Sequence, residues 1–366
     1  MDADVGFMRR ALELAEHARG LTSPNPMVGA LVVRDGVVVG EGFHARAGAP
    51  HAEAVALADA GGAARGATLY VTLEPCVHQG RTPPCAPAVV AAGIRRVVVA
   101  TGDPNPLVAG RGLDVLRAAR IEVSTGVLEV EARAQNRVFL TAIEAGRPHV
   151  TLKAALTLDG KIADGRGGSR WITGDLARRE AHRLRSEADA IVVGIGTVLQ
   201  DDPQLTVRLD RPWPREPYRI VLDSTARTPP DARVIHAGTP ARALIAVGES
   251  APAAQRERLQ AAGATVVQCP TRDGRVDVVG LLLHLFAQDV RAVLVEGGAA
   301  VHGAFLDAGV VDRVAFFIAP LLLGGRQAPS AVAGAGRDLK GAVRLHEVTM
   351  RTFGDDVLVE GDVRRS

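Results

Sequence analysis

Short apolar runs that resemble buried strands alternate with helix-like segments along most of this chain, and no other feature restricts its fold as strongly. The runs at 67–72 and 96–100 are rich in apolar, β-branched residues and have the length of strands buried on both faces. Segments of 8–15 residues with helical character lie between such runs. Because strands joined through a helix pair in parallel, the sequence predicts an α/β chain with largely parallel sheets.

The chain is long enough for two domains. Its 366 residues exceed the usual size of one domain, about 100–200 residues. At Ala145-Gly146-Arg147-Pro148 a helical pattern stops and a strand-rich stretch begins, and glycine and proline are typical of such boundaries. We therefore predict one domain over residues 1–146 and a second over 147–366.

Periodicity and turn residues place individual elements in both halves. In the first half they predict an amphipathic helix within the first 19 residues, a hairpin around the turn at 34–36, the two strands named above, and helices that begin near His51, after Pro84, near 111–119 and near 129–145. In the second half they predict helices at 175–187, 278–288 and 300–308 among strands that extend from 149 to 361.

Composition and charge exclude several classes of protein. Hydrophobic residues make up 47% of the chain and charged residues 23%, which is typical of a globular protein and not of a disordered one. The 43 basic and 41 acidic side chains nearly cancel and aromatic residues are 3%, so no nucleic-acid partner is expected. Three cysteines are too few for a disulfide scaffold. Without a long apolar run or a secretory signal, we expect a cytoplasmic protein with no membrane partner.

Three features in the first half form a metal-binding pattern. His51-Ala52-Glu53 is followed by Cys76 after a strand and then by Cys85. One imidazole and two thiolates are the ligands of a catalytic zinc ion whose fourth position is left for water. Glu53 lies two residues after His51, where its carboxylate can move a proton without binding the metal. We also expect Pro75 to precede a helix whose N-terminus favours the Cys76 thiolate.

The pattern is similar to that of the zinc-dependent nucleoside and nucleobase deaminases, H-x-E followed by P-C-x-x-C, although eight residues separate the cysteines here. The wider context is more specific. Over essentially its whole length the chain resembles the bifunctional riboflavin-biosynthesis deaminase–reductase family, through the segments TSPNPMVGA, GEGFHARAGAPHAE, EPCVHQGRTPPC, DPNPLVAGRG and LKAALTLDGKIA.

For the first half, the resemblance implies a cytidine-deaminase-like α/β/α sandwich that hydrolytically deaminates 2,5-diamino-6-ribosylamino-4(3H)-pyrimidinone 5′-phosphate. It implies zinc ligation by His51, Cys76 and Cys85, with Glu53 as proton shuttle. Asn25 becomes a candidate contact to the pyrimidine edge, and a turn residue between two prolines is its alternative. Further candidate ring or ribose-phosphate contacts are His44, Arg81, Asp103 and Asn105.

The second half lacks the usual dinucleotide-binding fingerprint. The nearest match to G-x-G-x-x-G begins at Gly194 and ends on Leu199, which argues against a Rossmann domain. Residues 296–303, EGGAAVHG, follow one strand and precede a predicted helix. Small residues there let backbone N–H groups approach an anion at the helix N-terminus. A plain strand-to-helix turn is the alternative.

For this half the resemblance implies a dihydrofolate-reductase-like α/β domain that uses NADPH to reduce the ribosyl group, giving 5-amino-6-ribitylaminouracil 5′-phosphate. The implied cofactor contacts are Ala155, Trp171, Thr197, Asp201, Ser224, Gly298, Ala299, Ala300, Val301, His302, Gly303 and Ala304. The implied substrate contacts are Ser169, Arg185, Leu205, Arg208 and Glu296. Arg185 and Arg208 offer planar forks for a phosphate. Lys153, in the middle of a strand, is a candidate substrate contact or a structural ion pair.

Three alternatives stand beside this function. A regulatory or binding protein would keep the fold without turnover, which the presence of Glu53 and all three metal ligands opposes. A monofunctional zinc deaminase of a pyrimidine or nucleoside would have an inactive second domain, which the intact cofactor-side segments oppose. An editing deaminase needs a basic groove, but residues 1–146 contain 14 arginines, no lysine and 15 acidic residues. The expected partners are therefore a small pyrimidine ribose-phosphate substrate and further copies of the chain, in a dimer or a tetramer.

Overall fold

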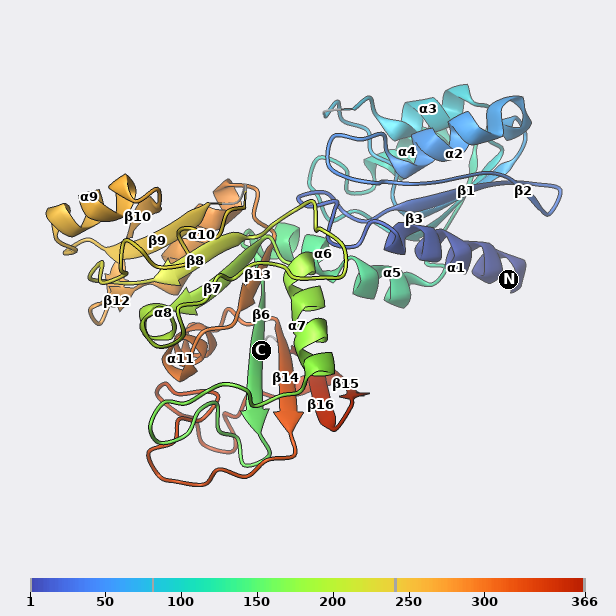
Figure 1. Ribbon diagram of the computed structural model, residues 1–366. Coiled ribbons are helices and arrows are strands. Elements are labelled where there is room, and N and C mark those ends of the chain that lie inside the picture. The colour runs from blue at the N-terminus through green and yellow to red at the C-terminus, as the bar shows by residue number, and fades with distance from the viewer. Residues whose placement is uncertain (1, 81, 240–241, 365–366) are drawn as a thin grey trace. The chain divides into compact units, whose positions relative to one another are not determined.

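The computed structural model describes residues 2–80, 82–239 and 242–364. The chain divides into two compact units, residues 1–146 (unit 1) and 147–366 (unit 2), and each contains its own sheet (Figure 1). No helix in the described part of the chain has both the length and the apolar character needed to cross a membrane.

Unit 1 is an α/β/α sandwich around a five-stranded sheet of order β2-β1-β3-β4-β5. Its elements are α1 (Asp2–Glu16), β1 (Gly29–Arg34), β2 (Val37–Phe43), α2 (Ala52–Ala60), β3 (Thr68–Leu73), α3 (Cys85–Ala91), β4 (Arg96–Thr101), α4 (Arg111–Ala118), β5 (Glu122–Thr125), α5 (Glu129–Gln135) and α6 (Arg137–Ala145), with a 3-10 turn at Gly61–Ala64. Helices α2, α3 and α4 pack on one face of the sheet, and α1 and α5 pack on the other. Only the β3-β4 and β4-β5 pairs are parallel, because β1 turns back through the predicted hairpin.

Apolar spacing explains these layers. On α1, Met8, Ala11, Leu12 and Ala15 follow helical spacing and are all buried against the sheet. The strands β3 and β4 are buried along nearly their whole length, as expected for central strands covered on both faces.

The helix predicted near 129–145 is broken into α5 and α6 at Asn136. The buried side chain of Asn136 accepts a hydrogen bond from the backbone N–H of Met27 (2.8 Å) and donates one to the Met27 carbonyl (2.7 Å). The helical spacing of apolar residues continues from α5 into α6, so the sequence pattern does not show where the helix breaks. The break arises because the Asn136 side chain hydrogen-bonds the backbone of Met27, which is far away in the sequence. The short strand β5 was also not predicted, because its four residues are half-buried or exposed.

We expect Asn136→Ala to lower the free energy of unfolding by about 1–3 kcal/mol, because it leaves the buried N–H and C=O of Met27 without partners. Urea unfolding of the full chain measures this. An exposed control, Gln79→Ala, should change stability by less than about 0.5 kcal/mol. Equal effects of the two substitutions would contradict the role given to Asn136.

Unit 2 is built on a nine-stranded sheet of order β10-β9-β8-β7-β13-β6-β14-β16-β15. The sheet strands are β6 (His149–Thr157), β7 (Ala190–Gly194), β8 (Tyr218–Leu222), β9 (Ala243–Gly248), β10 (Thr265–Cys269), β13 (Ala292–Val295), β14 (Arg313–Ala319), β15 (Leu345–Phe353) and β16 (Asp356–Val363). The helices are α7 (Asp175–Glu187), α8 (Ile195–Asp201), α9 (Ala253–Ala261), α10 (Val278–Ala287) and α11 (Ala299–Asp307), and a small hairpin pairs β11 (Thr271–Arg272) with β12 (Arg275–Val276). The strands from β10 to β14 are parallel, and β16 and β15 continue the sheet antiparallel. The structure adds α8, α9, β15 and the β11–β12 hairpin to the predicted elements.

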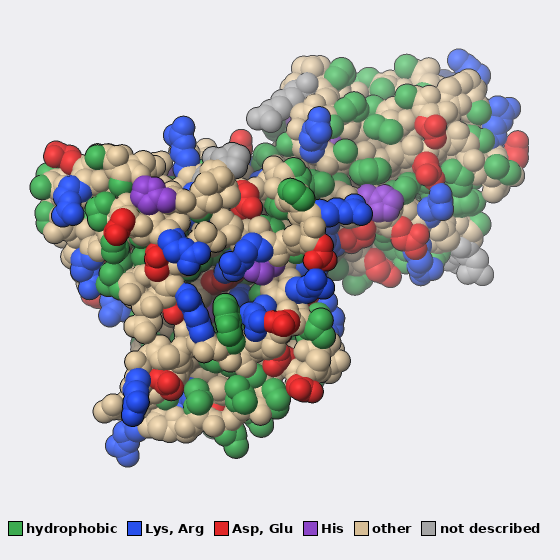
Figure 2. Space-filling view, viewed as in Figure 1, with side chains coloured by type: hydrophobic (Ala, Val, Ile, Leu, Met, Phe, Trp, Pro, Cys, Tyr) green, Lys and Arg blue, Asp and Glu red, His purple; other side chains and the backbone are tan. Residues whose placement is uncertain are grey.

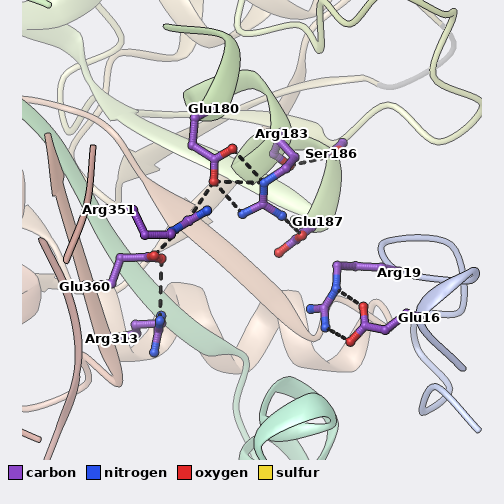
Figure 3. Close-up of polar contacts among 9 residues, drawn as sticks. All are labelled: Glu16, Arg19, Glu180, Arg183, Ser186, Glu187, Arg313, Arg351 and Glu360. Carbon is purple, nitrogen blue, oxygen red and sulfur yellow. Dashed lines mark hydrogen bonds and ion pairs between the residues drawn. The ribbon is translucent and has the colours of Figure 1, made fainter. Parts of the chain in front are cut away.

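A network of ion pairs fastens one face of α7 to the antiparallel end of this sheet (Figure 3). Arg183 pairs with Glu180 (2.8 Å) and Glu187 on α7, and Glu180 also pairs with Arg351 of β15 (2.8 Å). Arg351 pairs in turn with Glu360 of β16 (2.9 Å), which contacts Arg313 of β14 (3.5 Å). Because Glu180 and Glu360 are buried, these pairs fix the helix more firmly than exposed pairs would.

Candidate functional site

Three predicted metal ligands meet in unit 1. His51 precedes α2, Cys76 follows β3 in an irregular segment, and Cys85 is the first residue of α3. His51 Nδ1 lies 3.6 Å from Cys76 Sγ and 3.3 Å from Cys85 Sγ. Within the described ranges, this is the one group of three such side chains whose ligand atoms all lie within 4.8 Å of one another. One nitrogen and two sulfur atoms converging from separate elements fit a zinc ion with an open fourth position.

The prediction of a helix directly after Pro75 is wrong. Residues 74–80 are irregular, and the next helix is α3, which begins at Cys85 after Pro84. The backbone N–H of Cys85 nevertheless donates to Cys76 Sγ (3.4 Å). Hydrogen bonds from the Cys85 thiol and from His51 lower the pKa of Cys76 to about 4. The pKa of the Cys85 thiol is raised because it donates to Cys76 and is buried.

Glu53 lies in the first turn of α2, and its side chain is buried. Burial raises the pKa of Glu53 to about 7, against the charge of His51. A carboxyl group with such a pKa can both accept and release a proton near neutral pH. Glu53 is the second residue of α2, two positions after His51, and its side chain contacts Cys85. It therefore lies beside the three ligands without being one of them.

Two further predicted residues, Asn25 and His44, form a pair next to the ligands. Asn25 Nδ2 lies 3.0 Å from His44 Nε2, and His44 Nδ1 lies 3.1 Å from the Pro50 carbonyl. Because an amide nitrogen only donates, His44 Nε2 accepts and Nδ1–H donates to Pro50. The His44 ring packs edge-on against His51, with ring centroids 5.4 Å apart.

Glu74 is a residue that the sequence analysis missed. Its buried carboxylate accepts backbone hydrogen bonds from Asp103, Gly110, Gly112 and Leu113, at 2.9–3.4 Å. It therefore holds the loop that contains the predicted residues Asp103 and Asn105 beside the segment of Cys76. Burial raises the pKa of Asp103 to about 6. The one signal for Glu74 in the sequence is the free-energy cost of burying a glutamate without a partner.

The predicted contact Arg81 lies outside the described residues.

In unit 2 most of the predicted cofactor contacts lie at the carboxyl ends of neighbouring parallel strands. Thr197 follows β7, Ser224 follows β8 and Gly298 follows β13. In parallel α/β sheets ligands bind at this edge. A Cβ on Gly297 would lie 2.4 Å from the Val193 Cα, so this close approach of two strand ends requires glycine.

Residues 298–304 are not equivalent, which the sequence analysis did not foresee. The buried His302 ring lies 2.9 Å from the Ala331 carbonyl and 3.2 Å from the Val295 carbonyl. A Cβ on Gly303 would lie 2.3 Å from the Ala333 oxygen. The His302 side chain and Gly303 therefore serve packing, and the backbone amides at the start of α11 remain the groups suited to an anion.

The sequence analysis expected Arg185 to offer a free guanidinium fork to a phosphate, but in the structure this fork is bound to Glu296. Its Nε and Nη2 donate to the two oxygens of Glu296, each at 2.7 Å, and Nη1 donates to the Thr206 carbonyl (2.9 Å). Lys153 Nζ lies 3.8 Å from Glu296. Burial opposes ionisation of Glu296, but the charges of Arg185 and Lys153 prevail and lower its pKa to about 2. Burial lowers the pKa of Lys153. The buried carboxylate thus binds both cations.

Comparison with known proteins matches both units. The family model "RibD C-terminal domain" matches residues 148–359, and the model "Cytidine and deoxycytidylate deaminase zinc-binding region" matches residues 1–101. The riboflavin biosynthesis protein RibD of Aquifex aeolicus is 44% identical over 359 residues, which cover 98% of each chain. The chain belongs to the RibD family. It is therefore a riboflavin-biosynthesis enzyme that is both a zinc-dependent deaminase and an NADPH-dependent reductase.

Solved structures agree with this RibD assignment over the whole chain. Acinetobacter baumannii RibD is 38% identical, with a TM-score of 0.89, and the match covers 100% of this chain and 99% of that one. A Thermotoga maritima diaminohydroxyphosphoribosylaminopyrimidine deaminase/5-amino-6-(5-phosphoribosylamino)uracil reductase is also 38% identical, with a TM-score of 0.84 and 99% of each chain covered. The expected cytidine-deaminase-like unit followed by a reductase unit is confirmed, and both units weigh against a monofunctional deaminase.

The remaining predicted residues lie around the same edge of unit 2. Ser169 donates to Asp201 at the end of α8 (3.0 Å), and Leu205 is buried. Trp171 is 66% exposed, and the Arg178 guanidinium lies 4.5 Å from the centroid of its ring, so one face of the ring is already covered. Ala155 lies on β6, two residues after Lys153.

Arg208 contacts His182 of α7, a residue that the sequence analysis did not select. His182 and Arg185 are three residues apart and share the face of α7 opposite to the ion-pair network. No motif marks His182, and only its position one helical turn before Arg185 links it to the site.

Proposed function

We propose that unit 1 deaminates 2,5-diamino-6-ribosylamino-4(3H)-pyrimidinone 5′-phosphate, and that unit 2 then reduces the ribosyl group to give 5-amino-6-ribitylaminouracil 5′-phosphate. The observation that carries this proposal is the convergence of His51, Cys76 and Cys85 beside the buried Glu53. The buried group of Glu296, Arg185 and Lys153 supports the second reaction, because it lies at the edge where a parallel sheet binds its ligands.

In unit 1, His51, Cys76 and Cys85 would hold zinc. Zinc supplies the Lewis acidity that turns water into a nucleophile near neutral pH. Glu53 takes a proton from the attacking water and delivers it to the amine that leaves as ammonia. Asn25, fixed by His44, orients the pyrimidine ring, and Glu74 fixes the loop that contains Asp103 and Asn105.

In unit 2, NADPH would be held by Ala155, Trp171, Thr197, Asp201, Ser224 and the backbone of the segment 298–304, with the first amides of α11 facing its phosphates. NADPH supplies the hydride that reduces C1′ of the ribosyl group. Lys153 stabilises the developing ring oxygen charge, and Glu296 keeps the Lys153 ammonium in place. Ser169, Leu205 and Arg208 position the sugar phosphate, and Arg185 fixes Glu296.

The proposal extends to assembly and location. We propose that the protein acts in the cytoplasm as a homo-oligomer, a dimer or a tetramer. Strand β15 supports this assembly, since it forms an edge of the nine-stranded sheet and exposes Val348 and Met350. Unpaired strand edges readily pair or pack with another chain.

One experiment tests the two activities together. Purified full-length protein receives the diaminopyrimidinone substrate and NADPH, and ammonia release and nicotinamide absorbance are followed in the same sample. We expect ammonia to appear first and NADPH oxidation to follow it. Oxidation of NADPH without ammonia release would contradict the proposed order, and release of ammonia without oxidation would contradict the activity of unit 2.

We expect about one zinc ion per chain in the wild type and almost none in Cys76→Ala, because two remaining ligands cannot close the site. Elemental analysis measures the metal. Cys269→Ala is the matched control, since that cysteine is buried in the core of unit 2 and should leave the zinc content unchanged. Zinc retained by Cys76→Ala would contradict the proposed ligand set.

A further inference from the structure

The contact between His182 and Arg208 contains a hydrogen-bonding conflict. The backbone N–H of Arg208 points at His182 Nδ1 (3.1 Å), and the side-chain Nε–H of the same arginine points at His182 Nε2 (3.2 Å). A neutral imidazole carries one ring proton and accepts at only one nitrogen. In either tautomer, one N–H of Arg208 therefore faces another N–H.

His182 is neutral in this position. Burial, followed by the charges of Arg185 and Arg208, lowers the pKa of His182 to about 4, with Lys153 acting in the same direction and Glu296 against it. A backbone N–H is fixed by the chain, whereas the Arg208 side chain can turn. The ring therefore best accepts at Nδ1, which places its proton on Nε2 and makes Nε2–H and Arg208 Nε–H two neighbouring donors without an acceptor between them.

The surroundings favour an anionic acceptor. The charges that act most strongly on the His182 ring are those of three cations, Lys153, Arg185 and Arg208, and of one carboxylate, Glu296, which Arg185 already binds. Within the described residues, no hydrogen bond or ion pair engages the two Nη groups of Arg208. Figure 2 shows Lys and Arg side chains gathered around a hollow over the region between α7 and α8.

Helix α7 presents this donor rigidly. On the opposite face of the helix, Glu180 pairs with Arg351 of β15, which pairs in turn with Glu360 of β16, and Arg183 joins Glu180 to Glu187 within α7 (Figure 3). The His182 ring is therefore placed before any ligand arrives, which reduces the entropy lost on binding.

We infer that His182 is a further ligand of the substrate's 5′-phosphate group, donating its Nε2–H to a phosphate oxygen beside the Arg208 guanidinium. This inference rests on the proposed function, in which Arg208 positions the sugar phosphate. A phosphate oxygen accepts from both groups at once and removes the donor–donor conflict.

The test compares ribose 5-phosphate with ribose as inhibitors of the NADPH-dependent reduction, using the zinc-loaded full-length protein. In the wild type, ribose 5-phosphate should bind much more tightly than ribose. His182→Leu should reduce this preference about 10- to 100-fold, the range for one hydrogen bond to a charged group, and should raise KM far more than it lowers kcat. His182→Gln, which keeps an N–H donor, should retain most of the preference.

NADPH binding shows whether unit 2 of each variant is folded, and His236→Leu, at an exposed histidine, is the matched control. A wild-type preference in His182→Leu together with a lost preference in Arg208→Leu would overturn the role of His182 alone. An equal loss in His182→Leu and His182→Gln would also overturn it, since the ring would then act only through its shape. No preference in the wild type would overturn the proposed phosphate site itself.

Discussion

A Glu53→Gln protein should bind zinc normally and release ammonia about 10²–10⁴-fold more slowly than the wild type. The amide preserves the volume of the buried side chain but cannot take up and deliver a proton. His51, Cys76 and Cys85 are unchanged, so the metal content should stay at the wild-type value. Ammonia release under single-turnover conditions and elemental analysis of the same sample measure the two quantities.

Unit 2 provides the control for this variant within the same chain. NADPH oxidation with the already deaminated intermediate should be nearly unchanged, because none of the residues proposed for reduction lies in residues 1–146. Deamination at close to the wild-type rate would show that Glu53 is not the proton carrier. A parallel loss of reduction in folded protein would show that the two sites depend on each other.

The zinc ligands could be predicted from the sequence because the chemistry limits the choices. Two of the three cysteines lie close to an H-x-E tripeptide, and few residue types bind zinc. A proline before a cysteine occurs at both Pro75-Cys76 and Pro84-Cys85, and the sequence predicted a helix after each, but only the helix after Pro84 forms. The local signal is the same at the two places, so it could not show that one of them stays irregular.

The contacts that depend on distant partners could not be predicted. Arg185 and Glu296 are 111 residues apart, so no local pattern shows that the arginine fork is bound to a carboxylate. The same holds for Glu74, whose four backbone partners lie 29–39 residues further along the chain, beyond α3 and β4. Both cases follow from the rule that a buried charge must be paired, but the rule does not name the partner.

Glu296→Gln should destabilise unit 2 and abolish reduction while sparing ammonia release. Removing this carboxylate leaves Arg185 and Lys153 buried without their shared anion, which typically costs about 3–5 kcal/mol. Reduction should fall at least about 100-fold, because the Lys153 ammonium loses the group that keeps it charged and in place. Urea unfolding, NADPH oxidation and ammonia release are measured on the same preparation.

The double variant Arg185→Met with Glu296→Met separates stability from activity. Replacing a buried ion pair by apolar side chains of similar size is often neutral for stability, so the double variant should be more stable than Glu296→Gln. Its reduction should nevertheless stay low, because Glu296 is proposed to act on Lys153 in the site and not only to hold Arg185. Recovery of both stability and reduction in the double variant would show that the pair has a structural role alone, and that Lys153 does not need a carboxylate beside it for hydride transfer.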